Sequence, residues 1–175
     1  FERFRQTDSI SIAGGEPLVH PQIVEIVREV ARRGHKPIVN TNGVAMTREY
    51  LLRLKAAGLR GLTFHIDSGQ KRPGWTGKNE LELNELRLHY ARMVGEVGGL
   101  SCAFNATVYE NTLSQVTDIV EWGRSHADIV HWMHWNVPLA SPRPFAVTIH
   151  DLILLDYPSV RATTLGRFGY RVKEA

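Results

Sequence analysis

The chain has 175 residues, of which 43% are hydrophobic and 22% charged, and its formal net charge is +3. This length suits one domain with a full hydrophobic core and is short for two. No run approaches the ~20 apolar residues that a membrane helix needs. The basic residues are scattered rather than gathered on one segment, so the sequence does not support nucleic acid as a partner.

The only cysteine, Cys102, excludes an intramolecular disulfide and any multi-cysteine metal site built from these residues alone. A single thiol fits the reducing cytoplasm, which is the predicted location. The sequence begins at Phe1 and shows no leader, so we expect that Phe1 is not the native terminus.

One unit recurs along the chain: a short β-branched run, a polar turn and then a helical pattern. These units predict strands at 9–13, 36–40, 62–68, 100–109 and 129–139, with helices beginning near residues 21, 47, 83 and 112. Thr47 is expected to cap the second helix, and Thr112 and Gln115 are expected to form a capping box at the fourth.

Strands that alternate with helices indicate a parallel α/β sheet with right-handed crossovers. Five such units do not close an eight-stranded barrel, so an open twisted sheet or a partial barrel is predicted. The pattern decays after 141–144, Ser-Pro-Arg-Pro. We therefore expect one domain over 1–140, with 141–175 as an appendix packed on it.

Polar side chains stand where each predicted strand ends. In parallel α/β folds this edge carries the site, because loops and helix N-termini converge there. The residues at this edge are Glu16, Asn40, Thr41, Asn42, His65, Asp67, Ser68, Asn105, Thr107, His134 and Asn136. Ordinary polar loops are the alternative explanation for the same pattern.

The most specific element is Gly14-Gly15-Glu16-Pro17, directly after the first predicted strand. Two glycines remove the Cβ atoms and let the polar groups of a ligand approach the backbone. An adjacent carboxylate can pair with an ammonium group, and Pro17 fixes the exit of the turn. These features suit the head group of a zwitterionic ligand; a tight turn with a helix-capping Glu16 is the alternative.

Three motifs resemble those of the radical S-adenosylmethionine (radical SAM) superfamily. Ser-Ile-Ala-Gly-Gly-Glu-Pro-Leu at 11–18 is similar to the second-strand motif of that superfamily. Thr-Asn-Gly at 41–43 resembles its third-strand ending, and His-Ile-Asp-Ser at 65–68 its fourth-strand ending. The resemblance covers roughly residues 8–139, and the Gly-Gly-Glu-Pro motif is the most specific part.

The resemblance implies a partial (β/α)6 barrel that holds S-adenosylmethionine at a 4Fe-4S cluster and forms a 5′-deoxyadenosyl radical. It implies that Gly14, Gly15 and Glu16 hold the methionine amino group. Ser68, together with Asp67, is expected at the ribose or carboxylate, with Asn105 in a similar role. The backbone from His134 through Asn136 to Val137 is expected to flank the adenine.

The cluster ligands are not in this chain, since the CxxxCxxC loop of the superfamily is missing along with its first strand. One explanation is that the sequence is an excerpt that begins after the cluster loop, which then lies upstream of Phe1. The other is a cluster-free module that binds S-adenosylmethionine or a partner without radical chemistry. The first explanation implies an enzyme with an unidentified substrate and a reductant protein such as a flavodoxin or ferredoxin.

Three residues are candidates for contact with the substrate. Lys71 and Arg72 lie in a loop over 69–79 that lacks the spacing of a phosphate loop and could equally be a solvated surface loop. His65 falls on the same strand face as Asp67 and is a candidate substrate contact or proton donor. A zinc site from His65, His131 and His134 is disfavoured, because the last two fall on opposite faces.

Overall fold

The computed structural model describes residues 8–107, 110–130 and 132–134. The predictions that concern His131, Asn136 and 141–175 lie outside these residues. Of β5, the backbone alone is described. The elements in chain order are β1 (Ser9–Ile12), η1 (Pro17–Val19), α1 (Ile23–Arg32), β2 (Lys36–Thr41), α2 (Arg48–Ala56), β3 (Gly61–His65), α3 (Asn84–Val97), β4 (Ser101–Asn105), η2 (Glu110–Gln115), α4 (Val116–Ser125) and β5 (Trp132–His134).

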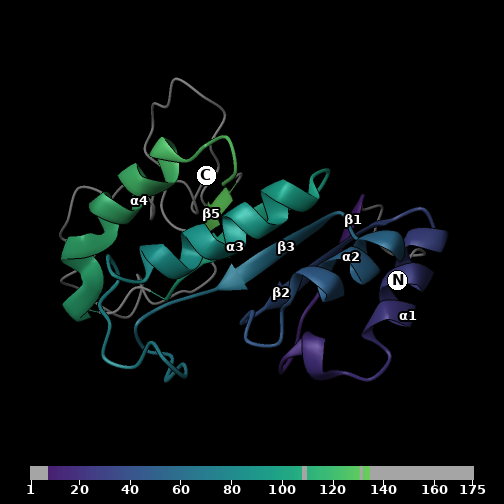
Figure 1. The fold of residues 1–175 in the computed structure, drawn as a ribbon, viewed down its shortest axis with the longest axis horizontal. Helices are drawn as coiled ribbons and strands as arrows, with labels where there is room; N and C mark the ends of the chain where they lie inside the picture. Colours follow the sequence, from purple (N-terminus) through teal and green to yellow (C-terminus); the bar gives the residue numbers. More distant parts are fainter. Residues whose placement is uncertain (1–7, 108–109, 131, 135–175) are drawn as a thin grey trace, which may run out of the picture.

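The five strands form one parallel sheet in the order β1-β2-β3-β4-β5. The helices follow one another along this sheet, from α1 at one end to α4 at the other (Figure 1). A doubly wound sheet would reverse its strand order at a switch point, whereas a barrel adds each strand to the same edge. The observed order is therefore that of a partial barrel, as the sequence predicts.

The core lies between the sheet and the helices. Val39 of β2, Phe64 of β3 and Phe104 of β4 are each 0% exposed, and in β2 and β3 the residues on either side of them are half-buried. On the helix side, Leu51 and Leu54 of α2 are equally buried. The sheet thus buries one face under the helices and keeps more polar side chains on the other, the pattern expected where a barrel interior holds a ligand.

The two capping predictions have different outcomes. Thr47 caps α2, since its hydroxyl accepts a hydrogen bond from the Tyr50 N–H at 3.1 Å. The capping box is wrong: a 3₁₀ turn precedes α4, and the N-cap Gln115 makes no side-chain capping bond. Its amide oxygen instead accepts a hydrogen bond from the Glu80 N–H at 3.1 Å, so a distant buried donor replaces the local one.

No helix within the described ranges is long and apolar enough to cross a membrane.

Candidate functional site

The exits of the strands meet at one edge of the sheet because all five strands are parallel and lie in chain order. In the strand register His65 pairs with Asn105, and Asn105 pairs with His134. Three predicted site residues therefore occupy one row at the carboxyl ends of β3, β4 and β5. Two rows below, Asn40 on β2 pairs with Thr63.

Gly14 and Gly15 form an exposed turn at the exit of β1. Their φ angles are +105° and +54°, a backbone conformation that residues with a Cβ atom rarely adopt. A Cβ atom added at either position would meet nothing within 4 Å. The glycines are therefore needed for the backbone conformation, and the space beside them is open to a ligand.

The carboxylate of Glu16 joins the exit of β1 to the exit of β2. Its Oε1 accepts hydrogen bonds from the Leu18 N–H at 3.0 Å and from the Thr41 hydroxyl at 2.5 Å. Its Oε2 accepts one from the Asn42 N–H at 2.6 Å. A carboxylate has about four acceptor positions, so one position on Oε2 is left for a further donor.

The neighbours of Glu16 support this arrangement. Pro17 is buried and opens η1, where its missing N–H leaves no donor unsatisfied. The Asn42 side chain accepts a hydrogen bond from the Val44 N–H at 2.8 Å and so stabilises its own turn. Gly43 is required by packing, because a Cβ atom there would lie 2.9 Å from Cζ of Tyr90.

His65 and Asp67 form a pair at the exit of β3. The His65 Nε2 lies 2.7 Å from the Asp67 Oδ2, and the side chains are 42% and 1% exposed. The Asp67 carboxylate also accepts hydrogen bonds from the N–H groups of Gly69, at 3.0 Å, and Thr107, at 3.1 Å. The face assignment made from the sequence is therefore confirmed for this pair.

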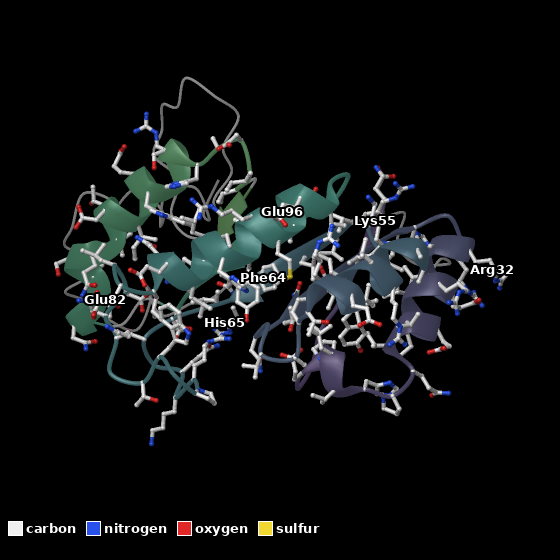
Figure 2. All side chains as sticks on the ribbon, in the orientation of Figure 1. Arg32, Lys55, Phe64, His65, Glu82 and Glu96 are labelled. Atoms are coloured by element: carbon white, nitrogen blue, oxygen red, sulfur yellow. The ribbon has the colours of Figure 1, made fainter. Side chains whose placement is uncertain are left out.

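These donors keep Asp67 ionised. Burial by itself would raise the pKa of Asp67, but the His65 imidazole and the Thr107 N–H together hold it below its ordinary value. Nε2 of His65 faces this carboxylate and lies 3.3 Å from the Thr107 hydroxyl. Figure 2 labels His65 at the end of β3. The second ring nitrogen, Nδ1, is the one left to meet a ligand.

The loop over 69–79 is not uniformly solvated. Lys71 is exposed, but Arg72 is only 7% exposed. The Arg72 guanidinium donates hydrogen bonds to the His65 carbonyl oxygen, at 3.1 Å, and to the Gln70 amide oxygen, at 3.0 Å. The two candidate substrate residues therefore differ in environment, although they are adjacent in sequence.

Arg72 lies within electrostatic reach of both strand exits described above. Burial lowers the pKa of its guanidinium, while the Tyr90 hydroxyl and the carboxylates of Asp67 and Glu16 oppose that shift. Arg72 therefore places a buried positive charge within reach of the carboxylates at both exits.

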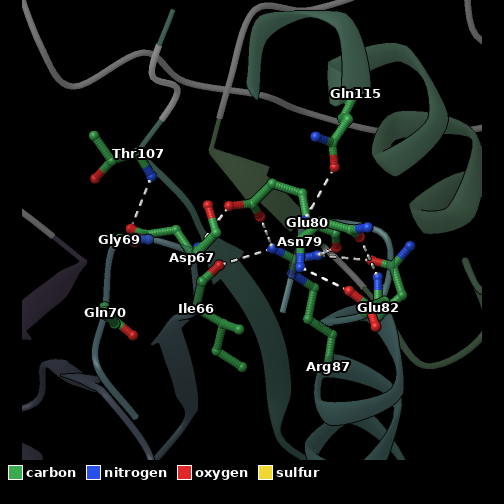
Figure 3. Close-up of polar contacts among 12 residues, drawn as sticks. Ile66, Asp67, Gly69, Gln70, Asn79, Glu80, Glu82, Arg87, Thr107 and Gln115 are labelled. Atoms are coloured by element: carbon green, nitrogen blue, oxygen red, sulfur yellow. Dashed lines mark hydrogen bonds and ion pairs between the residues drawn. The ribbon is translucent and has the colours of Figure 1, made fainter. Parts of the chain in front are cut away.

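Two buried residues that the sequence analysis missed lie behind the β3 exit. Arg87 is 0% and Glu80 2% exposed, and they form an ion pair with 2.5 Å between Nη2 and Oε2. Glu80 Oε1 accepts a hydrogen bond from the Ser68 N–H at 2.6 Å (Figure 3). A signal was available: Arg87 stands four residues after Leu83 and four before Ala91, in the apolar stripe of α3.

The chain matches the family model of the radical SAM superfamily over residues 1–123. It belongs to this superfamily. A curated relative, the AdoMet-dependent heme synthase of Methanosarcina barkeri, is 26% identical over 132 residues, which are 73% of this chain and 36% of the relative. A second, the tungsten-containing aldehyde ferredoxin oxidoreductase cofactor-modifying protein of Pyrococcus furiosus, is 39% identical over 67 residues, 38% of this chain and 19% of the relative.

Among solved structures, the fold is similar to that of Streptococcus suis SuiB bound to S-adenosylmethionine. The TM-score is 0.55 at 15% identity, and the match covers 93% of this chain and 37% of SuiB. At this identity the likeness concerns the fold alone. This radical SAM chain spans about a third or less of the length of the two curated relatives above.

The described residues fit one cofactor of the superfamily and not the other. The open backbone at Gly14 and Gly15, the remaining acceptor position of Glu16, and the unpartnered buried Oδ1 of Asn40 can receive a polar ligand. The described residues cannot hold an iron–sulfur cluster, because the only cysteine among the 175 residues is Cys102, which is buried in β4. Within the described ranges no group of three or more His, Cys, Asp or Glu side chains could hold a metal ion.

Proposed function

We propose that this chain is the S-adenosylmethionine-binding part of a cytoplasmic radical SAM enzyme that modifies an unidentified substrate. One observation carries the proposal. An exposed, side-chain-free backbone turn at Gly14 and Gly15 lies at the same edge of a parallel sheet as Asp67, Ser68 and Asn105.

At the β1 exit we propose that the backbone of Gly14 and Gly15 approaches the methionine end of the cofactor. The ammonium group then donates to the remaining acceptor position on Glu16 Oε2, and Pro17 holds the turn closed. Because Thr41 and Asn42 already orient this carboxylate, it can receive the ammonium without moving. A preoriented acceptor reduces the ordering cost of binding.

At the other strand exits, Ser68 with Asp67 would contact the ribose or the carboxylate of the cofactor, and Asn105 would assist from β4. Asn42 would contribute from the β2 exit. The backbone near His134 and Asn136 would flank the adenine. The sheet edge supports the members of this set that the structure describes, because the carboxyl ends of the five parallel strands lie along it.

When bound and reductively cleaved, S-adenosylmethionine supplies a radical that removes a hydrogen atom from a substrate. The thiolates of the 4Fe-4S cluster that the superfamily implies would have to come from outside these 175 residues, which contain one cysteine. A reductant protein such as a flavodoxin or ferredoxin would supply the electron.

His65, Arg72 and Lys71 are the proposed substrate side of the site. His65 directs Nε2 at Asp67, so its Nδ1 can exchange a proton or a hydrogen bond with the substrate. Arg72 offers a buried positive charge and the exposed Lys71 a mobile one, and both favour a substrate with an anionic group.

The test uses the protein expressed from its complete gene, purified without oxygen and reconstituted with iron and sulfide. Incubation with S-adenosylmethionine and dithionite should produce 5′-deoxyadenosine, measured by mass spectrometry. The Glu16→Gln variant should produce far less. A brown, cluster-loaded protein that forms no 5′-deoxyadenosine would refute radical chemistry.

A second candidate function is a cluster-free module that binds S-adenosylmethionine without cleaving it. Gly14, Gly15 and Glu16 could bind the cofactor in such a module as well, because none of them is a ligand of the cluster. The same experiment separates the two. A protein from the complete gene that binds S-adenosylmethionine but takes up no iron supports the module and excludes the enzyme.

A further inference from the structure

The backbone that carries Asp67 and Ser68 leaves the sheet after His65. The Ile66 N–H still pairs with the Asn105 carbonyl oxygen of β4 at 2.9 Å. Beyond this bond the segment has left the ladder, so the Ile66 carbonyl and the Ser68 N–H need partners elsewhere. Ile66 is 0% exposed, and polar backbone atoms in such a place are costly when they are unpaired.

Arg87 and Glu80 supply those two partners. Arg87 Nη2 donates a hydrogen bond to the Ile66 carbonyl oxygen at 2.8 Å, and Glu80 Oε1 accepts one from the Ser68 N–H at 2.6 Å. Figure 3 shows Glu80 and Arg87 beside Ile66 and Asp67 at this exit. The ion pair therefore holds the backbone on both sides of Asp67, through hydrogen bonds to the residue before it and the residue after it.

The pair is itself held by Asn84 of α3, the helix that carries Arg87, and by Gln115 of η2. Arg87 Nη1 donates to the Glu80 carbonyl oxygen and to the Asn84 Oδ1, each at 2.7 Å. The Glu80 N–H donates to Gln115, in the η2 turn that follows β4. Arg87 Nε is the one guanidinium nitrogen that lacks an acceptor among the described residues. Glu80 thus ties the β3 exit to both α3 and η2.

The free energy of a buried ion pair indicates that this pair fixes the geometry of the backbone over 66–68 rather than simply adding stability. Removing two charges from water costs about as much as their mutual attraction returns, and apolar residues of the same size often stabilise a core better. What apolar residues cannot do is bond the Ile66 carbonyl and the Ser68 N–H. The hydrogen bonds to the β3 exit are therefore the property that this particular pair provides.

We infer that Glu80 and Arg87 are positioning residues for the cofactor. They set the Ile66–Ser68 backbone so that Asp67 and Ser68 meet S-adenosylmethionine, without touching it themselves. This inference rests on the proposed function, because it concerns the same edge of the sheet.

The experiment compares Glu80→Gln with a matched control, Glu82→Gln. Glu82 lies two residues further on and also pairs with a cation, Lys78, but at a side-chain exposure of 43%. Both variants are made in the protein expressed from its complete gene and loaded with its cluster. The dissociation constant for S-adenosylmethionine is measured by anaerobic equilibrium dialysis, together with the melting temperature. We expect Glu80→Gln to raise the dissociation constant at least tenfold and Glu82→Gln to change it less than twofold.

A double variant, Glu80→Gln with Arg87→Met, separates positioning from stability. It leaves no unpaired buried charge, so its melting temperature should return toward that of the wild type. Its affinity should stay low, because the Ile66 carbonyl has lost its donor. It also serves as the test if Glu80→Gln alone does not fold.

The outcomes are distinct. Affinity that recovers together with the melting temperature in the double variant, or that never falls in Glu80→Gln, overturns the inference and leaves the proposed function standing. A wild-type protein that binds no S-adenosylmethionine overturns the proposed function, and this inference with it.

Discussion

The exits of β1 and β3 serve the same edge of the sheet but are built in opposite ways. At the β1 exit the chain exposes a bare backbone, Gly14 and Gly15, and steadies it with one half-buried carboxylate. At the β3 exit the backbone is held from behind by a fully buried ion pair, Glu80 and Arg87. One exit presents an open turn, and the other holds its backbone with buried charged side chains.

This difference predicts which property, stability or ligand binding, a substitution at each exit should change. Substitutions behind the β3 exit disturb buried charge and should cost folding free energy in addition to any loss of cofactor affinity. Substitutions at the β1 exit change a surface turn and should mainly cost binding. The predictions below test this contrast, beginning with the largest expected effect.

Arg87→Leu should lower the free energy of unfolding by about 3–5 kcal/mol, because it leaves the Glu80 carboxylate buried without its cation. Urea unfolding followed by circular dichroism measures this loss. Arg124→Leu, which breaks an ion pair whose side chains are 33% and 60% exposed, is the control and should have a small effect. Equal losses in the two variants would contradict the contrast.

Asp67→Asn should lower the free energy of unfolding by about 2 kcal/mol at pH 7, and the difference from the wild type should shrink in acid. The sign follows from the lowered pKa of Asp67 in the folded state. The stabilisation is present above the unfolded value, about 3.9, and is lost as the pH falls through the folded pKa. Urea unfolding at pH 7, 5 and 3.5 measures it; a pH-independent difference would show that the charge is not the cause.

Gly15→Ala should cost about 1–2 kcal/mol of stability, because alanine is strained at a φ of +54°. Gly74→Ala is the matched control: its φ is +78°, and an added Cβ atom there also meets nothing within 4 Å. Both variants should melt earlier, but only Gly15→Ala should weaken S-adenosylmethionine binding. Equal affinities in dialysis would remove the β1 exit from the site.

Thr41→Val should cost about 1 kcal/mol, the smallest stability loss of the series. The Thr41 hydroxyl donates to Glu16 Oε1 and accepts a hydrogen bond from the Gly43 N–H at 2.9 Å, and valine can do neither. Because Glu16 keeps its bonds to Leu18 and Asn42, the turn should persist. Thermal melting measures the loss. A loss of stability as large as that of Arg87→Leu would show that the β1 exit is held as firmly as the β3 exit.

Much of this protein could be predicted from its sequence. The alternation of β-branched runs with helical patterns predicts the parallel sheet, because those periodicities depend on neighbouring residues. The Gly-Gly-Glu-Pro turn after β1 points to a ligand for the same reason: backbone freedom and an adjacent acid are local properties. The Thr47 cap is confirmed on equally local grounds.

What the sequence could not decide is which partners the buried charged residues have. The position of Arg87 in the apolar stripe of α3 indicates burial but does not identify its partner, and Arg72 could equally belong to a solvated surface loop; both are buried. Gln115 bonds Glu80 rather than its own helix end. Only the tertiary structure decides these cases, because the free energy of a charge or an amide depends on partners that lie far away in the chain.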